Sequence, residues 1–236
     1  MRNIIGNLIN KKSLEMALGI FMLLVVTIMA KNTEEISAKI NQTDKAEKPY
    51  IVAVDAGHGG QDPGKVGIND CLEKDVNLEI AFMVKELLEA EGVTVHMTRE
   101  SDSGLYSESD VNKKVADLNK RCGLIDGWNS DIAVSIHQNS YSDSSVNGGQ
   151  VFYYASSDEG MKLAQNIQIE LAQVCQKTRQ AKANKDYYML LNVKCPIVIV
   201  ECGFLSNWEE AELLITEDYQ RKVAESIVKG VMEYLQ

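Results

Sequence analysis

Proline, aromatic residues and basic charge are all scarce in this sequence. Its 236 residues include three prolines, 6% aromatic residues, and 24 Lys and Arg against 34 Asp and Glu. The low proline count, together with only 16 glycines, excludes a collagen-like or low-complexity chain. With a net charge of −10, the chain lacks the excess of basic residues that nucleic-acid-binding domains carry. No nucleic-acid partner is therefore predicted. The remaining composition is that of a globular protein, in a chain long enough for one sizeable domain plus an appendage.

Cysteine pairs at metal-binding spacing are also missing. The five cysteines stand at positions 71, 122, 175, 195 and 202, and no two of them form a CxxC motif. An odd number without such spacing predicts neither a disulfide framework nor a thiolate zinc site. We expect most of them to be small core residues.

A long apolar run occurs once, close to the N-terminus. No charge occurs between positions 16 and 30, and the run is preceded by basic residues and followed by acidic ones (Arg2, Lys11, Lys12; Glu34, Glu35). This asymmetry predicts that the rest of the chain lies outside the cytoplasmic membrane. Residues 1–31 are either an uncleaved membrane anchor, which we favour, or a signal peptide cut near Ala30.

The rest of the chain divides into a linker and one domain. Residues 32–49 are polar and aperiodic, which is typical of a linker, and the domain covers 50–236. Strand and helix patterns alternate in this domain (strands 50–55, 93–98, 132–136, 150–154, 197–200; helices 75–90, 108–126, 159–176, 207–215, 217–235). Residues 177–194 are the least regular part. The alternation predicts an α/β fold, in which a mostly parallel twisted sheet carries helices on both faces and is preceded by the N-terminal hydrophobic helix.

Side chains able to bind a metal or move protons follow three of the predicted strands. His58 lies in the glycine-rich stretch 57–60 after the first strand, His137 follows 132–136, and Glu201 follows 197–200. Glu73 precedes the first helix of the domain. Sites in α/β proteins assemble at the carboxyl ends of the strands, so we expect these side chains to meet. Two histidines and a carboxylate form a tridentate zinc set with a position free for water, although manganese and iron would also accept them.

Each of these residues also has a purely structural interpretation. A histidine after a strand is often only hydrogen-bonded, and Glu73 could serve only the dipole of the helix that follows. Glu201 is harder to explain in this way, because an unpaired charge at the end of a buried strand is costly. Asp55, three residues before His58, either orients a ligand or binds backbone at the strand end. His96 lies in the middle of a strand, and we predict that it is not a ligand.

A phosphate-binding loop is the main competing motif. Residues 59–65, GGQDPGK, fit the GxxxxGK pattern and follow a strand. The next residue is Val66, however, where the motif needs a Ser or Thr hydroxyl for Mg²⁺. The helical pattern begins only near residue 75, so the phosphate would lack the N–H groups of a helix start. We therefore do not predict a nucleotide site.

The motifs as a set resemble the zinc-dependent N-acetylmuramoyl-L-alanine amidases of the amidase-3 type. They occur in the order of that family over residues 50–235 (VDAGHGG at 54–60 with DPG at 62–64, EK at 73–74, TR at 98–99 with Asp102, SIHQN at 135–139, PIVIVECGFLSN at 196–207). The resemblance implies that His58, Glu73 and His137 are zinc ligands and that Glu201 is the catalytic carboxylate. The implied substrate is peptidoglycan, cut at the amide bond between the lactyl group of N-acetylmuramic acid and L-alanine.

A narrower resemblance is to the sporulation branch, the CwlD-like amidases, because the chain is short and has no wall-binding repeats. This implies a role in spore cortex maturation with muramic-δ-lactam formation, in the space between forespore and mother cell. It also implies contact with the membrane through the N-terminal segment and, as for some members, an activating protein partner. Gln138 departs from the family, which usually has a small residue there, so the pocket wall beside His137 is expected to differ. Leu191 also departs, since many members carry an arginine there.

Two functions of other kinds are compatible with the same residues. One is a zinc carboxypeptidase that acts within the stem peptide, and the other is a non-catalytic cell-wall-binding module on a membrane tether. The presence of all four site residues, His58, Glu73, His137 and Glu201, favours an enzyme over a binding module.

Overall fold

The computed structural model describes residues 15–19, 21–23, 25, 27, 29, 49–175, 177 and 179–236. The chain divides into two compact units, Met1–Lys48 and Pro49–Gln236. In the first unit, the described residues between 15 and 29 are helical. Across the described part of the chain, no helix combines the length and the apolar character that a membrane crossing requires. Much of the predicted anchor (1–31) and residues 32–48 of the predicted linker lie outside the described residues.

The second unit is built on a six-stranded sheet in the order β2-β1-β3-β6-β4-β5. Its strands are β1 Ile51–Ala56, β2 Thr94–Met97, β3 Ile132–Asn139, β4 Gln150–Tyr154, β5 Lys182–Asn184 and β6 Ile197–Phe204. The first four strands in the sheet order run parallel, whereas β4 is antiparallel to β6 and β5 is parallel to β4. The prediction of a mostly parallel sheet is confirmed.

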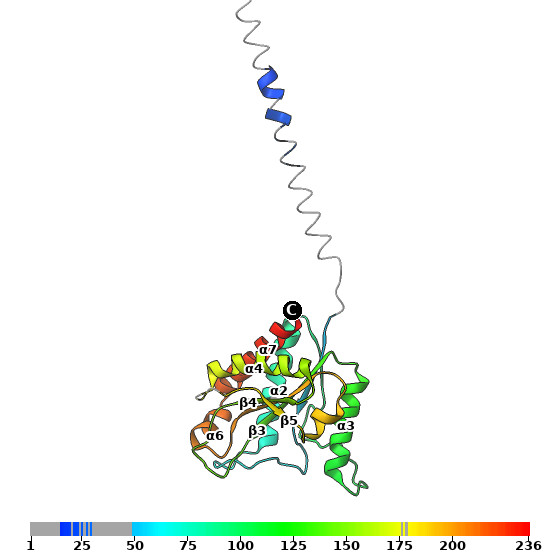
Figure 1. The fold of residues 1–236 in the computed structure, drawn as a ribbon, viewed down its shortest axis with the longest axis vertical. Coiled ribbons are helices and arrows are strands. Elements are labelled where there is room, and N and C mark those ends of the chain that lie inside the picture. The colour runs from blue at the N-terminus through cyan, green and yellow to red at the C-terminus, as the bar shows by residue number, and fades with distance from the viewer. Residues whose placement is uncertain are drawn as a thin grey trace, which may run out of the picture. The chain divides into compact units, whose positions relative to one another are not determined.

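Helices cover both faces of this sheet (Figure 1). The helices are α2 Glu73–Ala90, α3 Lys113–Gly127, α4 Asp158–Val174, α5 Tyr188–Asn192, α6 Trp208–Leu214 and α7 Glu217–Leu235. The apolar sides of α2, α4 and α7 pack with β-strand residues into one core cluster, while α3 and α5 contribute to a second cluster on the opposite face. Alternate residues of a strand enter opposite clusters, as with Val52 and Ala53 of β1. Strands covered on both sides must be apolar throughout, and all eight residues of β6 are buried.

The structure corrects several predicted boundaries. Strands β3 and β6 continue past the predicted ends, because their backbones stay paired up to Asn139 and Phe204. His137 and Glu201 therefore lie within strands rather than after them. Helix α3 begins at Lys113 instead of 108, where the side chain of Asn112 accepts a hydrogen bond from the Val115 N–H (3.1 Å) and caps the helix.

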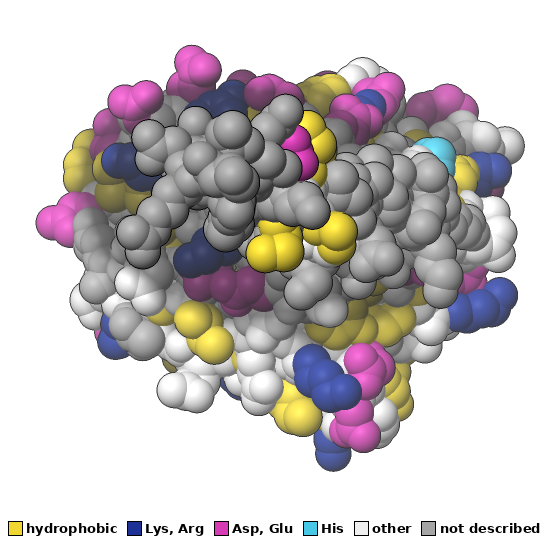
Figure 2. Space-filling view, turned by 90° about the horizontal axis from the view of Figure 1, so that it is seen from above, with side chains coloured by type: hydrophobic (Ala, Val, Ile, Leu, Met, Phe, Trp, Pro, Cys, Tyr) yellow, Lys and Arg dark blue, Asp and Glu magenta, His cyan; other side chains and the backbone are white. Residues whose placement is uncertain are grey.

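Residues 177–194, which show no periodicity, contain the short strand β5 and the single-turn helix α5. All five cysteines are free, and Cys122, Cys175 and Cys202 are buried, as expected for core residues. On the face of the molecule seen in Figure 2, acidic, basic and hydrophobic side chains are interspersed where described residues are visible.

Candidate metal centre and active site

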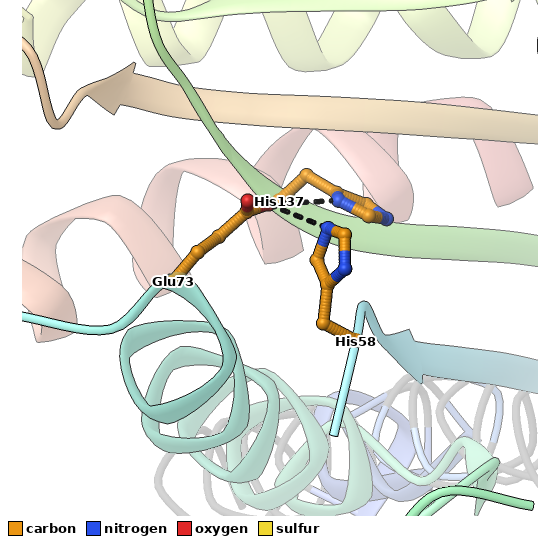
Figure 3. A group of neighbouring side chains, drawn as sticks. All are labelled: His58, Glu73 and His137. Carbon is orange, nitrogen blue, oxygen red and sulfur yellow. Dashed lines mark hydrogen bonds and ion pairs between the residues drawn. The ribbon is translucent and has the colours of Figure 1, made fainter. Parts of the chain in front are cut away.

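Three of the predicted residues converge at the carboxyl ends of β1 and β3. Figure 3 shows Glu73, the first residue of α2, reaching toward both imidazole rings. Its Oε1 atom lies 2.9 Å from His137 Nδ1 and 3.3 Å from His58 Nε2. One ligand atom from each residue lies within 4.8 Å of the other two, a grouping found once among the described residues. Residues that are 79 positions apart in sequence thus offer two nitrogens and an oxygen to one point.

Glycines provide the space in which these side chains meet. A Cβ atom on Gly57 would lie 2.3 Å from two atoms of the His137 ring, and one on Gly64 would lie 2.5 Å from Glu73 Oε2 and 2.8 Å from His58 Cδ2. Gly64 also has a φ of 68°, which favours glycine. The glycine-rich stretch therefore makes room for the candidate ligands themselves.

Neighbouring residues fix both the backbone and the imidazole ring of His58. Its backbone has a φ of 63°. This conformation costs a non-glycine residue about 1–3 kcal/mol and persists only where the surrounding structure imposes it. The Arg121 guanidinium donates to the His58 carbonyl (2.6 Å), and Asp62 Oδ2 lies 2.8 Å from His58 Nδ1. With Nδ1 bound to Asp62, Nε2 is the nitrogen left to face Glu73. This role of Asp62 was missed in the sequence, although its spacing of four residues from His58 within one tight loop was a usable signal.

Asp55 makes no direct hydrogen bond to a candidate ligand or to the backbone of any described residue through its side chain. It is fully buried, and it accepts hydrogen bonds from Thr98 Oγ1 (2.7 Å), Arg121 Nη1 (2.7 Å) and Ser135 Oγ (2.5 Å). Burial alone would raise the pKa of Asp55, but the charge of Arg121 and the hydroxyl donors lower it to about 2. Arg121 also donates to the carbonyls of Ala56 and His58. Asp55 therefore acts on the loop through Arg121.

Glu73 lies between the two imidazoles as an anion. Burial would raise the pKa of Glu73, but hydrogen bonds with His137 and His58 hold it well below its usual range. Glu73 also accepts from the Lys65 N–H (2.8 Å) and the Gln138 N–H (3.1 Å). Burial lowers the pKa of His58, yet its bonds to Glu73 and Asp62 raise it above the ordinary value. An anionic oxygen between two imidazoles is a donor set that suits a divalent transition metal.

Glu201 lies on the strand next to His137. The two residues are direct Cα partners across β3 and β6, so their side chains leave the sheet on the same face. Glu201 is buried, and its Oε2 atom has no hydrogen-bond partner among the described residues. Burial raises the pKa of Glu201 to about 7, with His137 lowering it and Glu73 raising it further. Such a carboxyl group can take up and release a proton near neutral pH.

Comparison with known proteins agrees with this arrangement. The N-acetylmuramoyl-L-alanine amidase family model matches residues 52–233. The chain belongs to that family. It is 43% identical over 188 residues to the germination-specific N-acetylmuramoyl-L-alanine amidase of Bacillus subtilis, covering 78% of this chain and 79% of that protein. It is 31% identical over 206 residues to the amidase LytC of Bacillus subtilis, covering 86% of this chain but 39% of LytC.

A solved structure shares the fold. The CwlD amidase of Clostridioides difficile, in complex with the GerS lipoprotein, superimposes with a TM-score of 0.76 and 39% identity. The match covers 79% of this chain and 98% of that one. The resemblance to the amidases, with its CwlD-like branch and its α/β fold, is confirmed.

Other motif residues of the amidase form the scaffold of the glycine-rich loop. Arg99 donates to the carbonyls of Ala56 (2.8 Å), Gly57 (3.1 Å) and Lys74 (2.7 Å). The Lys74 ammonium in turn bonds the Gly60 carbonyl and Asp102. These contacts tie the loop to the first turn of α2, which fixes His58 relative to Glu73.

The remaining predictions near the site have clear outcomes. His96 stacks on Trp128, with ring centroids 5.1 Å apart, and does not join the metal-binding group. Helix α2 begins eight residues after Lys65, so the GGQDPGK stretch lacks the helix start of a phosphate loop. Gln138 is buried and donates to Asn77 (3.2 Å), so its side chain faces α2 instead of forming a pocket wall.

A cavity of about 330 Å³ opens beside the two histidines. His58, His137 and Asp62 are among its lining residues. Helices α3 and α5 and the loop before α3 also contribute lining residues (Tyr106, Lys113, Lys114, Leu118, Met189). A substrate in this amidase can therefore approach the candidate metal centre along the face of α3.

Proposed function

We propose that this chain is a zinc-dependent amidase that hydrolyses the bond between the lactyl carbonyl of N-acetylmuramic acid and the nitrogen of L-alanine. The observation that carries the proposal is the convergence of His58, Glu73 and His137 beside Glu201 on the neighbouring strand. Membership of the amidase family, over most of the domain, supports this substrate and this bond.

His58, Glu73 and His137 would hold the zinc ion. Two imidazoles and one carboxylate match catalytic zinc sites, which keep a position for water or substrate. When bound, Zn²⁺ supplies Lewis-acid stabilisation of charge on the carbonyl oxygen and lowers the pKa of a water molecule to about 7. Asp62, bonded to His58 Nδ1, fixes the tautomer and the direction of that ring.

Glu201 is the general base and then the general acid of the reaction. Its carboxylate accepts the proton that the attacking water loses, and returns it to the nitrogen of L-alanine as the C–N bond breaks. The raised pKa and the free Oε2 atom suit both transfers. The backbone pairing of β3 and β6 keeps Glu201 beside His137 throughout.

The physiological role proposed here is spore cortex maturation outside the cytoplasmic membrane. The support is similarity to a germination-specific amidase and to a CwlD amidase bound to a lipoprotein. By analogy we propose that residues 1–31 tether this chain to the membrane or direct its export, that 50–236 are the catalytic domain, and that a protein partner activates it.

The test is mass spectrometry of purified peptidoglycan after digestion with the full chain. An amidase releases peptides that begin with L-alanine and leaves free lactyl carboxylates on intact glycan. Chelation should abolish this release, and added Zn²⁺ should restore it. Shortened peptides still attached to the glycan would indicate a carboxypeptidase, and sedimentation with peptidoglycan without any cleavage would indicate a wall-binding module.

The zinc ligands are tested by metal content. We expect His137→Ala to lose the bound zinc measured by elemental analysis, because one of three protein donors is gone. His96→Ala is the matched control, since His96 is the one of the three histidines that is not a proposed ligand, and it stacks on Trp128. Stoichiometric zinc in His137→Ala would contradict the proposed ligand set.

A further inference from the structure

The cavity beside the metal centre has a chemically distinct outer wall. Its volume of about 330 Å³ lies at the small end of ligand pockets. Leu118 of α3 and Met189 of α5 give this wall an apolar part, and Lys113 and Lys114 give it two cations. The candidate metal-binding histidines and the two lysines thus line the same cavity.

The two lysines differ in how far their charges are already paired. The Lys113 ammonium lies 2.6 Å from Glu108 Oε2 and 5.3 Å from the centre of the Tyr106 ring. Lys114 is exposed, and no ion pair or hydrogen bond of its side chain joins it to a described residue. Lys114 is therefore the cation that remains available to a ligand.

The acidic residues around the cavity are each hydrogen-bonded to groups other than the two lysines. Asp62 accepts from the Gly64 N–H (3.0 Å) and contacts His58 Nδ1. Asp117 accepts from Arg121 Nε (2.5 Å) and the Leu105 N–H (2.6 Å). Asp55 is bound by Arg121 from beneath. Arg121 thus pairs with two of the three carboxylates that line the cavity, and the third, Asp62, feels the charge of Lys114 without forming an ion pair with it.

Helix stability does not explain the position of the lysines. They are the first two residues of α3, and the first turn of this helix contains no acidic residue. Cations are disfavoured at a helix start, where the backbone dipole is positive. Their placement is therefore unfavourable with respect to the dipole of α3 itself, and Lys113, unlike Lys114, has Glu108 as a compensating partner.

We propose that Lys114, supported by Lys113, binds a carboxylate of the peptide that follows L-alanine in the substrate. This inference rests on the proposed amidase function and names the part of the substrate that the α3 wall recognises. The apolar patch of Leu118 and Met189 receives the aliphatic part of the same peptide. The carboxylate belongs either to an acidic residue next to L-alanine or to the peptide C-terminus, and the experiment separates the two.

The test is equilibrium binding of peptides that are not consumed, measured by calorimetry with the full chain and excess Zn²⁺. The probes are L-alanyl-γ-D-glutamyl-L-lysine, the same peptide with the α-carboxyl of glutamate amidated, and the same peptide with an amidated C-terminus. We expect one of the two amidations to weaken binding about threefold to tenfold, as for a partly exposed charged hydrogen bond. The amidation that does so identifies the carboxylate.

Substitution of the lysine should reproduce that loss. We expect Lys114→Gln to bind the unmodified peptide as weakly as the wild type binds the sensitive amide, and to bind that amide unchanged. Lys114→Arg should retain the preference. Lys120→Gln, an exposed lysine of the same helix outside the cavity, is the matched control and should bind all three peptides normally. The melting temperature of Lys114→Gln should not fall, because the lysine is disfavoured at the helix start.

Four results would overturn the inference: no binding of any peptide at millimolar concentration, equal binding of all three, an equal loss for acid and amide in Lys114→Gln, or the same loss in Lys120→Gln. The outcome is separate from that of the proposed function. Peptidoglycan cleavage without a carboxylate preference leaves the amidase function intact, whereas a carboxylate preference without any cleavage counts against the amidase function alone.

Discussion

Asp55 and Glu201 are both buried carboxylates on the same sheet, and their surroundings are opposite. Asp55 receives three hydrogen bonds, one of them from an arginine, and its pKa falls to about 2. Glu201 Oε2 receives none among the described residues, and burial raises its pKa to about 7. One acid is solvated by the protein and fixed as an anion, while the other is kept able to change its charge. The difference separates a structural carboxylate from a reactive one.

The largest effect on stability should come from removing the negative charge of Asp55. We expect Asp55→Asn to lower the free energy of unfolding by about 3–5 kcal/mol, because it leaves Arg121 buried without its main counter-charge. Urea denaturation at pH 7 measures this loss. Asp117→Asn is the matched control, since Asp117 also accepts from Arg121 but is less buried, and its loss should be smaller. Equal losses would show that Asp55 has no special role.

The lowered pKa of Asp55 also predicts how the stability of the protein responds to acid. The pKa of Asp55 is about 2 in the folded state against an ordinary 3.8, so its contribution to stability is complete above the ordinary value. That contribution is lost as the pH falls through the folded value. Asp55→Asn should lack this part of the acid transition. An unchanged acid transition between pH 4 and 2 would contradict the assignment.

Substitution of Glu201 should show the reverse pattern, a loss of activity without a loss of stability. We expect Glu201→Gln to lower kcat by at least ~100-fold, the low end for loss of a general base, with zinc content unchanged. Its stability at neutral pH should be retained or raised, because the unpaired buried charge is gone. In metal-free protein, a pKa raised from 4.5 to about 7 means that stability falls as the pH rises through this interval. Glu201→Gln should remove that slope. Normal turnover by the variant would exclude Glu201 from the mechanism.

The smallest predicted effect concerns Gly57, which contacts both the scaffold of the glycine-rich loop and the His137 ring. Its carbonyl accepts from Asn77 and Arg99 in the scaffold, while its missing side chain leaves space for the His137 ring. We expect Gly57→Ala to weaken zinc binding about tenfold, as when the support of a ligand is altered. A competition titration with a chelator measures this. Gly123→Ala is the control, because a Cβ there meets nothing within 4 Å. Unchanged zinc affinity in Gly57→Ala would show that His137 can move without loss.

Much of the fold could be predicted because the apolar strands and amphipathic helices carry clear periodicities. The run Ile197–Val200 reads as a buried strand, and the alternation of strands and helices indicates the parallel sheet. Helix α5 and strand β5 could not be found, since five and three residues are too few to show a period. The ends of β3 and β6 were missed because pairing of the two backbones continues after the apolar pattern stops.

The candidate site residues could be predicted from the sequence, but the residues that hold them in place could not. His58, Glu73, His137 and Glu201 stand out because each is a reactive side chain at the edge of an apolar element. Their proximity is a finding of the structure, and their roles as ligands and base remain proposals. The link from Asp55 through Arg121 to the loop joins residues 66 positions apart, and no local pattern reports it.

The pairing of His137 with Glu201 has a wider consequence. Both residues sit on adjacent parallel backbones inside the sheet, whereas the cavity residues proposed to bind the peptide carboxylate lie on α3, which packs against one face of that sheet. Arg121, further along α3, still connects this helix to Asp55 and to the His58 carbonyl, whereas Lys113 and Lys114 in its first turn make no such contact. If Lys114 binds the substrate as proposed, substitutions confined to the first turn of α3 should change substrate preference and leave the contacts of Arg121 with the centre in place.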